Sequence, residues 1–210
     1  MESVESIKDR NPDSNLTPIQ LDVTSQDSIN AAATFVSNTF GRLDVLINNA
    51  GVANGDQDIA KRHQINFATN VTGPVLMSIA FRELLLKSEK PYSLFVSSVV
   101  GSMTLAADPN SPVYRGPPNG ETYRASKSAL NMIVLQMLAT RESSDPIKLF
   151  LIDPGMVRSN LTGKGLERTR LRNLRAGDPE DSARLYLSIL EGRRDDEEGK
   201  FVHKDGQHPW

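Results

Sequence analysis

The sequence predicts an α/β fold: a single domain, residues 1–210, built on a doubly wound parallel sheet. Segments with strand character alternate with segments of helical periodicity, which is typical of parallel strands joined by crossover helices. In addition, the runs Leu43–Ile47 and Ile147–Ile152 are short and almost wholly apolar. Such runs are expected of strands that are buried on both faces of a sheet.

The predicted strands end in polar or turn-forming residues. Leu16–Val23 ends in Asp-Val, and Leu43–Ile47 runs into Asn-Asn-Ala-Gly. Leu94–Ser98 ends in two serines, and Ile147–Ile152 is stopped by Asp-Pro-Gly. A last short strand is expected at Lys200–His203.

The predicted helices lie between these strands and have recognisable start and stop signals. The first starts at Thr24 or Ser25 and stops at Gly41, and a long one covers 58–87 with a bend at Gly73-Pro74. A third covers 122–142. The fourth covers 178–190 and opens with Asp-Pro-Glu-Asp, in which an N-cap is followed by proline and acidic residues. The segment 105–121, rich in Pro and Gly, is predicted to be a loop.

Composition excludes several classes of protein. Charged residues make up 24% of the chain and the net charge is −2, which argues against a nucleic-acid partner. No apolar run is long enough for a membrane span, and the acidic, polar start does not resemble a signal peptide. The chain has no cysteine, and its three histidines lack metal-ligand spacing. We therefore expect a cytoplasmic protein that binds a small molecule and holds no metal.

Ligands of such sheets bind beyond the carboxyl ends of the strands. Asp22, Asn49, Ser98 and the pair Pro154-Gly155 each come just after a predicted strand. The sequence therefore predicts that these residues line one crevice.

Tyr123 and Lys127 are four positions apart on a predicted helix, which places both side chains on one face. An ammonium near a phenol favours the phenolate and so lowers its pKa from about 10. We therefore expect Tyr123 to act as a general acid or base near neutral pH. Ser98 ends a strand from which its hydroxyl can face this pair. By itself a Tyr-x-x-x-Lys pair also occurs on ordinary surface helices.

The ordered set of motifs resembles the short-chain dehydrogenases/reductases. It comprises Asn48-Asn49-Ala50-Gly51, Asn70, Ser98, Tyr123-x-x-x-Lys127 and the run from Pro154 to Ser159, and the likeness extends from about residue 16 to the end. The resemblance implies a Rossmann-like fold of the carbonyl-reductase-like branch. It further implies an NAD(P)(H)-dependent oxidoreductase that interconverts a carbonyl and an alcohol on a small organic substrate.

The resemblance also implies the catalytic roles. Tyr123 would donate the proton to the carbonyl or accept it in oxidation, while Lys127 would lower the pKa of Tyr123 and hold the nicotinamide ribose. Ser98 would hydrogen-bond the substrate oxygen, and Asn70 would complete a water-linked proton relay. Ser97 competes with Ser98, but strand alternation places only one of them in the crevice and the family pattern favours Ser98.

A second set would bind the cofactor. Asp22 and Val23 would flank the adenine, and the Asn49–Gly51 turn would run along the cofactor. Val157 would meet the nicotinamide amide through its backbone, and Ser159 the phosphates. The full set is Asp22, Val23, Asn49, Ala50, Gly51, Tyr123, Lys127, Pro154, Gly155, Val157 and Ser159. The resemblance favours NADP(H) over NAD(H), and it suggests a homodimer or homotetramer that associates through the long helices near residues 57–88 and 122–142.

Two departures from the family pattern matter. The connection between Ser98 and Tyr123 is longer than usual, and the excess, Asp108–Gly120, would bulge over the substrate mouth. The family also opens with a strand, a Gly-rich phosphate-binding turn and a second strand, yet residues 1–15 contain no glycine. We therefore expect a domain without its first β-α-β unit. The alternative is a catalytically silent fragment or binding protein of the same fold.

Overall fold

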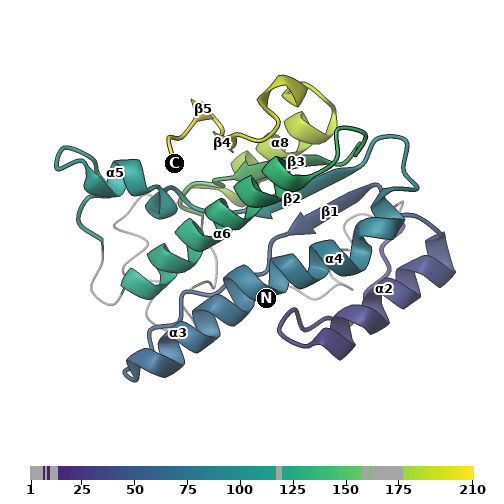
Figure 1. The fold of residues 1–210 in the computed structure, drawn as a ribbon, viewed down its shortest axis with the longest axis horizontal. Helices are drawn as coiled ribbons and strands as arrows, with labels where there is room; N and C mark the ends of the chain where they lie inside the picture. Colours follow the sequence, from purple (N-terminus) through teal and green to yellow (C-terminus); the bar gives the residue numbers. More distant parts are fainter. Residues whose placement is uncertain (1–6, 8, 10–13, 117–119, 158–160, 162–176) are drawn as a thin grey trace.

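The computed structural model describes residues 7, 9, 14–116, 120–157, 161 and 177–210. Its sheet has the strand order β1-β2-β3-β4-β5 (Figure 1). The strands are β1 (Val45–Asn48), β2 (Tyr92–Val96), β3 (Lys148–Ile152), β4 (Phe201–His203) and β5 (Gly206–Gln207). β1 to β4 are parallel and β5 is antiparallel to β4. The mostly parallel α/β sheet expected from the sequence is confirmed.

Helices cover both faces of the sheet. α2 (Gln26–Phe40), α4 (Gly73–Leu85) and α6 (Glu121–Thr140) supply one apolar core, while α8 (Pro179–Leu190) supplies the other. Alternate residues of β3 divide between them, since Leu149 and Leu151 belong to the first core and Phe150 and Ile152 to the second. This two-sided burial explains why the strands are almost continuously apolar in sequence.

α2 forms where its capping signals predict. The Ser25 side chain accepts a hydrogen bond from Ser28 N, and Gly41 ends the helix with φ = 76°, a conformation that favours glycine. Ile29, Ala32 and Val36 form its buried stripe.

The long helical region is interrupted by an irregular turn. α3 (Ile59–Phe67) runs into a π-helical turn, η1 (Ala68–Thr72), and then into α4. A bend at Gly73-Pro74 stays a prediction, and the π-helical turn lies directly before it. Pro74 has no N–H to give to the preceding turn, and the N–H of Gly73 reaches back to Ala68 O across five residues. The irregular turn thus precedes the proline, and Asn70 lies within it.

The strand predicted at Leu16–Val23 is wrong. Residues 14–22 have no regular secondary structure, and Leu21 is 40% exposed. A strand needs a ladder partner, and within the described residues the sheet ends at β1. The end of the segment instead packs against α4, because a Cβ on Gly73 would lie only 3.0 Å from Val23 O.

Several short elements were not expected from the sequence. A 3₁₀ turn, η2 (Val99–Gly101), follows β2, and α5 (Met103–Ala107) lies at the start of the predicted loop. The Ser102 side chain caps α5 by accepting a hydrogen bond from Leu105 N. β5 was also missed, and it completes a hairpin with β4. None of the helices in the described ranges is long and apolar enough to cross a bilayer.

Candidate active site

α6 carries Tyr123 and Lys127 on one face, against the carboxyl end of β2. Lys127 is 3% exposed, and its Nζ donates a 2.7 Å hydrogen bond to Val96 O. The same Nζ lies 5.8 Å from the centre of the Tyr123 ring. The predicted pairing of the two side chains is therefore present, with the lysine anchored to the last residue of β2.

The Ser98 side chain lies close enough to Tyr123 to influence the pKa of the phenol. Burial raises the pKa of Tyr123 to about 12, the Ser98 side chain acts to lower it, and the charge of Asp153 raises it. Burial also lowers the pKa of Lys127 to about 8. The expectation that Lys127 makes Tyr123 more acidic is therefore wrong for this structure, because desolvation of the phenol outweighs any effect of the ammonium.

The two adjacent serines point to different places, as strand alternation predicts. The Ser97 hydroxyl is buried and donates to Asn131 Oδ1 at 2.5 Å. Ser98 is only partly buried and influences the pKa of Tyr123. Of the two serines, Ser98 is therefore the one near Tyr123.

Asn70 is fully buried in η1 and holds the segment after β1. Its Oδ1 accepts from Val52 N at 2.8 Å, and its Nδ2 donates to Val52 O at 2.8 Å and to Ser126 Oγ at 2.9 Å. Both amide hydrogens are therefore occupied by protein. Gly51 lies beside this group, because a Cβ there would be 3.4 Å from Asn70 Oδ1 and 3.7 Å from Lys127 Nζ.

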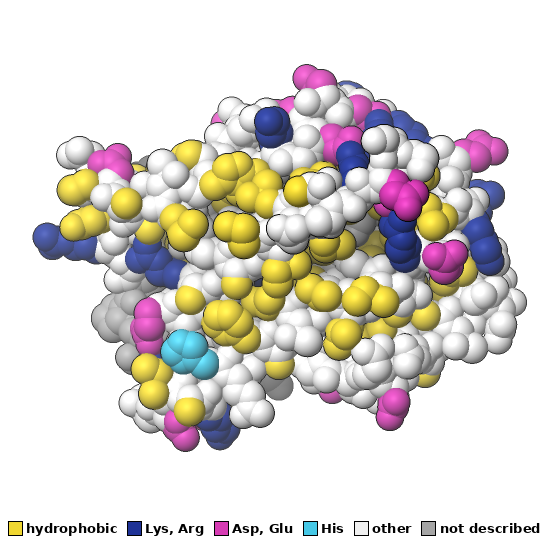
Figure 2. Space-filling model, viewed as in Figure 1, with side chains coloured by type: hydrophobic (Ala, Val, Ile, Leu, Met, Phe, Trp, Pro, Cys, Tyr) yellow, Lys and Arg dark blue, Asp and Glu magenta, His cyan; other side chains and the backbone are white. Residues whose placement is uncertain are grey.

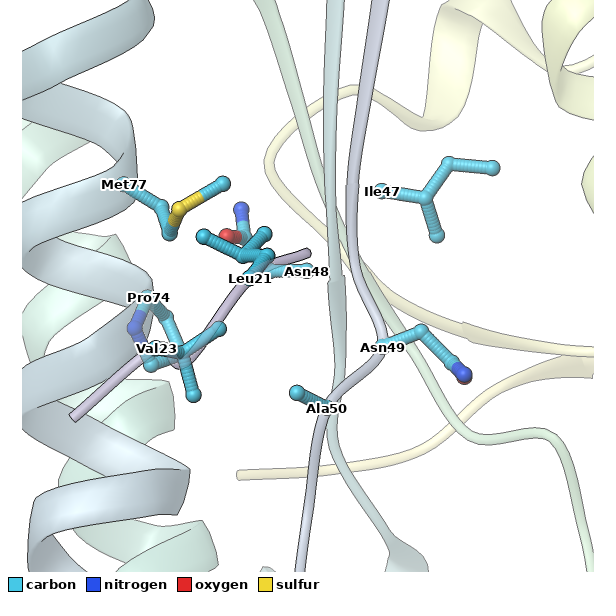
Figure 3. A pocket seen from close by; sticks show the side chains of 8 residues that line it. All are labelled: Leu21, Val23, Ile47, Asn48, Asn49, Ala50, Pro74 and Met77. Atoms are coloured by element: carbon cyan, nitrogen blue, oxygen red, sulfur yellow. The ribbon is translucent and has the colours of Figure 1, made fainter. Parts of the chain in front are cut away.

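Part of the predicted cofactor set lines one cavity of about 140 Å³, which Figure 3 shows between the end of β1 and α4. Val23, Asn49 and Ala50 share this cavity with Asn48, whose buried Nδ2 has no hydrogen-bond partner among the described residues. The remaining walls are apolar: Leu21, Ile47, Pro74 and Met77.

Asp22 is adjacent to this cavity but its side chain is turned to its own loop. Its Oδ1 accepts from Thr24 N and Thr24 Oγ1, and these bonds lower the pKa of Asp22. Its backbone N–H donates to Ser28 Oγ at 2.9 Å, which ties the residue to the first turn of α2.

The turn after β3 is built by Asp153. Its Oδ1 accepts from Gly155 N at 3.1 Å, and Gly155 adopts φ = 74°. Ser182 Oγ on α8 donates to Pro154 O, and Val157 forms a parallel bridge with Gly177. Ser159, the last predicted cofactor residue, lies outside the described residues.

Three participants were missed by sequence reasoning. Asn66 on α3, and Thr122 and Ser126 on α6, are buried and bonded within the group around Asn70. Asn66 lies one helical turn before Asn70, a spacing that was available as a signal in the sequence. On the other side of the turn after β3, His208 Nε2 lies 2.8 Å from Asp153 Oδ2.

Arg124, the residue after Tyr123, binds the backbone of the long connection between Ser98 and Tyr123. Its Nε donates to Val100 O at 3.3 Å and its Nη2 to Val113 O at 2.9 Å. Gly116 packs against the same guanidinium, since a Cβ there would come within 2.3 Å of Nη1. The long connection between Ser98 and Tyr123 is therefore fastened to α6. Within the described residues no group of three or more His, Cys, Asp or Glu side chains is arranged to hold a metal ion.

A family model described as short chain dehydrogenase matches residues 2–169 of this sequence. The chain belongs to the short-chain dehydrogenase family. Relatives agree: it is 34% identical to the short-chain dehydrogenase/reductase tropE of Talaromyces stipitatus over 92% of this chain and 76% of that protein. It is also 33% identical to the short-chain dehydrogenase/reductase eupG of a Phoma species, over 94% of this chain and 78% of that one.

Solved structures show the same fold. The NADPH-bound carbonyl reductase from chicken fatty liver matches with a TM-score of 0.78 and 27% identity, over 99% of this chain and 81% of that one. A short-chain dehydrogenase from Streptomyces avermitilis matches with a TM-score of 0.66 and 25% identity, over 89% and 71% of the two chains. Short-chain dehydrogenases are oxidoreductases that use nicotinamide cofactors and act on small molecules, and this member has the same Rossmann-like sheet.

Proposed function

We propose that this short-chain dehydrogenase interconverts a carbonyl and an alcohol on a small organic substrate, with Tyr123 as the proton donor or acceptor. The observation that carries the proposal is the position of the buried Lys127, which is anchored to Val96 O and lies 5.8 Å from the centre of the Tyr123 ring, with Ser98 near the same phenol. The hydroxyls of Ser98 and Tyr123 are suited to hold one oxygen atom between them. The bound cofactor supplies the hydride.

In reduction, the substrate carbonyl oxygen accepts hydrogen bonds from Ser98 and Tyr123. Tyr123 would give its phenolic proton to this oxygen, which becomes the hydroxyl of the alcohol. The Lys127 ammonium would stabilise the phenolate left on Tyr123, because its Nζ lies 5.8 Å from the centre of the Tyr123 ring. In the oxidation direction the proton returns from the alcohol to Tyr123.

We propose NADP(H) as the favoured cofactor, with NAD(H) as the second choice. The cavity between β1 and α4 fits a flat ring, since most of its walls are apolar. Val23, Asn49, Ala50 and Gly51 would hold the cofactor along this side, and Lys127 its ribose. The NADPH bound to the chicken carbonyl reductase supports the preference.

We propose two roles for Asn70. With both amide hydrogens engaged, the side chain positions Val52 and Ser126. A water-linked relay through Asn70 stays a prediction, and it would use the remaining lone pairs of the side-chain or backbone carbonyl.

We further propose that the protein is a cytoplasmic homodimer or homotetramer that associates through α4 and α6. Figure 2 shows hydrophobic side chains gathered along these two helices, and they include Ile79, 68% exposed, and Met132, 56% exposed. Exposed apolar surface of this kind is typical of association faces. Analytical ultracentrifugation of wild-type protein and of the variant Ile79→Glu tests the association.

The decisive experiment is calorimetric titration with NADPH and with NADH, followed by turnover assays on a panel of aldehydes and ketones. We expect binding of NADPH in the micromolar range, weaker binding of NADH, and consumption of reduced cofactor with at least one carbonyl. Absence of binding up to millimolar cofactor would overturn the enzyme proposal and favour the silent, binding-protein alternative.

A further inference from the structure

Three buried polar side chains recur at every fourth position along α3 and η1. They are Arg62, Asn66 and Asn70, and their exposures are 5%, 0% and 0%. A helix returns to nearly the same face every four residues, so the three form one line, here called the polar stripe. Because these polar side chains are buried, each of them needs hydrogen-bond partners within the protein.

The first set of partners is the backbone of the extended segment after β1. Asn70 makes two hydrogen bonds with Val52, and Asn66 makes two with Asn54: Asn54 N donates to Oδ1 at 2.9 Å, and Nδ2 donates to Asn54 O at 3.2 Å. Arg62 Nη1 donates to Asp56 O at 3.1 Å.

The spacing of the two elements explains this regularity. Two residues of extended chain advance about 6.6 Å, and four residues of helix advance about 6.0 Å. The backbone positions 52, 54 and 56 therefore meet the side chains at 70, 66 and 62 in antiparallel order. The polar stripe replaces the strand neighbour that an extended segment normally has.

The second set of partners lies on α6. Asn70 Nδ2 donates to Ser126 Oγ at 2.9 Å, Asn66 Nδ2 donates to Thr122 Oγ1 at 2.8 Å, and Arg62 forms an ion pair with Glu121. Thr122 and Ser126 are one helical turn apart and both fully buried. Tyr123 follows the first hydroxyl directly and Lys127 follows the second.

We propose that Asn66 is a positioning residue for the reaction, acting together with Asn70. Asn66 touches none of the reacting groups. It joins the segment that begins at Gly51, beside Lys127, to the turn of α6 that carries Tyr123. The inference rests on the proposed function for its catalytic consequence, whereas the hydrogen-bonded link itself can be tested without turnover.

The first test is amide hydrogen exchange in the protein without ligand. Replacing Asn66 by Ala removes the acceptor of the Asn54 amide, so we expect exchange at Asn54 to become about tenfold faster or more. Amides of β2 and β3 should keep their wild-type rates. Gln64→Ala, an exposed position on the same helix, is the matched control and should leave both exchange and activity unchanged.

The second test examines the hydrogen bond from Asn66 to Thr122 on α6 separately from the hydrogen bonds between Asn66 and Asn54. Thr122→Val keeps the shape of the side chain but removes the hydroxyl, and Thr122→Ser keeps the hydroxyl. We expect Thr122→Val to lower kcat about tenfold with little change in the KM for NADPH, and Thr122→Ser to retain most of the wild-type kcat. The two Asn54 hydrogen bonds should survive in both variants.

Each outcome decides a different point. Wild-type exchange at Asn54 in the Asn66→Ala protein would overturn the assignment of Asn66, as would equal kcat values for Thr122→Val and Thr122→Ser. Wild-type protein without turnover would overturn the proposed function and the catalytic part of this inference, whereas the exchange data would still decide the link itself. If Asn66→Ala does not fold, the comparison of kcat between Thr122→Val and Thr122→Ser decides the proposal.

Discussion

The ammonium of Lys127 donates a 2.7 Å hydrogen bond to the backbone carbonyl of Val96, the last residue of β2. This bond joins the middle of α6 to the carboxyl end of the sheet. It also fixes the lysine within reach of the Tyr123 ring, at 5.8 Å from the ring centre. The chemistry proposed for the site depends on this anchoring.

The free energy of unfolding should rise with pH between about 8 and 10.5. In this window the unfolded chain still holds a proton on Lys127, whose pKa in the folded protein is lowered to about 8 from 10.5. Because the unfolded state binds more protons, raising the pH favours the folded state. The full effect is about 3 kcal/mol, from about 1.4 kcal/mol per pKa unit. Urea unfolding across this range measures it.

Lys127→Met is the control for this pH effect, and its stability curve should lack the rise. Above about pH 10.5 both proteins should lose stability as the pH rises, because the unfolded chain loses the Tyr123 proton while the folded protein, with a pKa of about 12, retains it. Parallel curves for wild type and Lys127→Met between pH 8 and 10.5 would contradict the lowered pKa of Lys127.

Tyr123→Phe should reduce turnover at least about 1000-fold, because a phenyl ring has no proton to give and general acid catalysis commonly contributes 10²–10⁴-fold. Cofactor affinity, measured by calorimetry, should change less than about threefold. Tyr114→Phe, at a partly exposed position on the substrate side, is the matched control and should stay near wild-type turnover. Undiminished activity of Tyr123→Phe would remove the proton-donor assignment.

Gly101→Ala should destabilise the protein by about 1–3 kcal/mol, the usual cost of overpacking. A Cβ at Gly101 would lie 2.8 Å from Lys127 Cβ and 2.9 Å from its backbone carbonyl carbon, so α6 and η2 would have to separate. Gly55→Ala has nothing within 4 Å and should be nearly neutral. Thermal and urea unfolding of both variants would show the difference, and equal stabilities would mean that η2 does not pack this closely on α6.

Arg124→Met should raise the KM for the carbonyl substrate about tenfold and leave the KM for the cofactor near its wild-type value. The variant loses the hydrogen bonds to Val100 O and Val113 O that fasten the substrate-side connection to α6. Arg115→Met, at an exposed position in the same connection, serves for comparison. A parallel rise in both KM values would indicate a general loosening of α6 instead.

Much of the fold and part of the site could be predicted from local patterns. Continuous apolar runs predicted β1 and β3, and capping signals predicted α2 and α8. The four-residue spacing predicted that Tyr123 and Lys127 lie on one face of a helix. The strand expected at Leu16–Val23 failed because pairing depends on a neighbour and not on the segment itself. The π-helical turn was missed because it depends on which backbone hydrogen bond the proline removes.

The sequence by itself determined the layered α/β architecture and the family's ordered motifs, since hydrophobic periodicity and turn residues act over short distances along the chain. Only the tertiary structure decided how the polar groups pair: Asn66 with Asn54 and Thr122, Arg124 with the long connection, and Lys127 with β2. It also decided the direction of the Tyr123 pKa, because desolvation depends on everything that packs around the phenol and no spacing in the sequence encodes it.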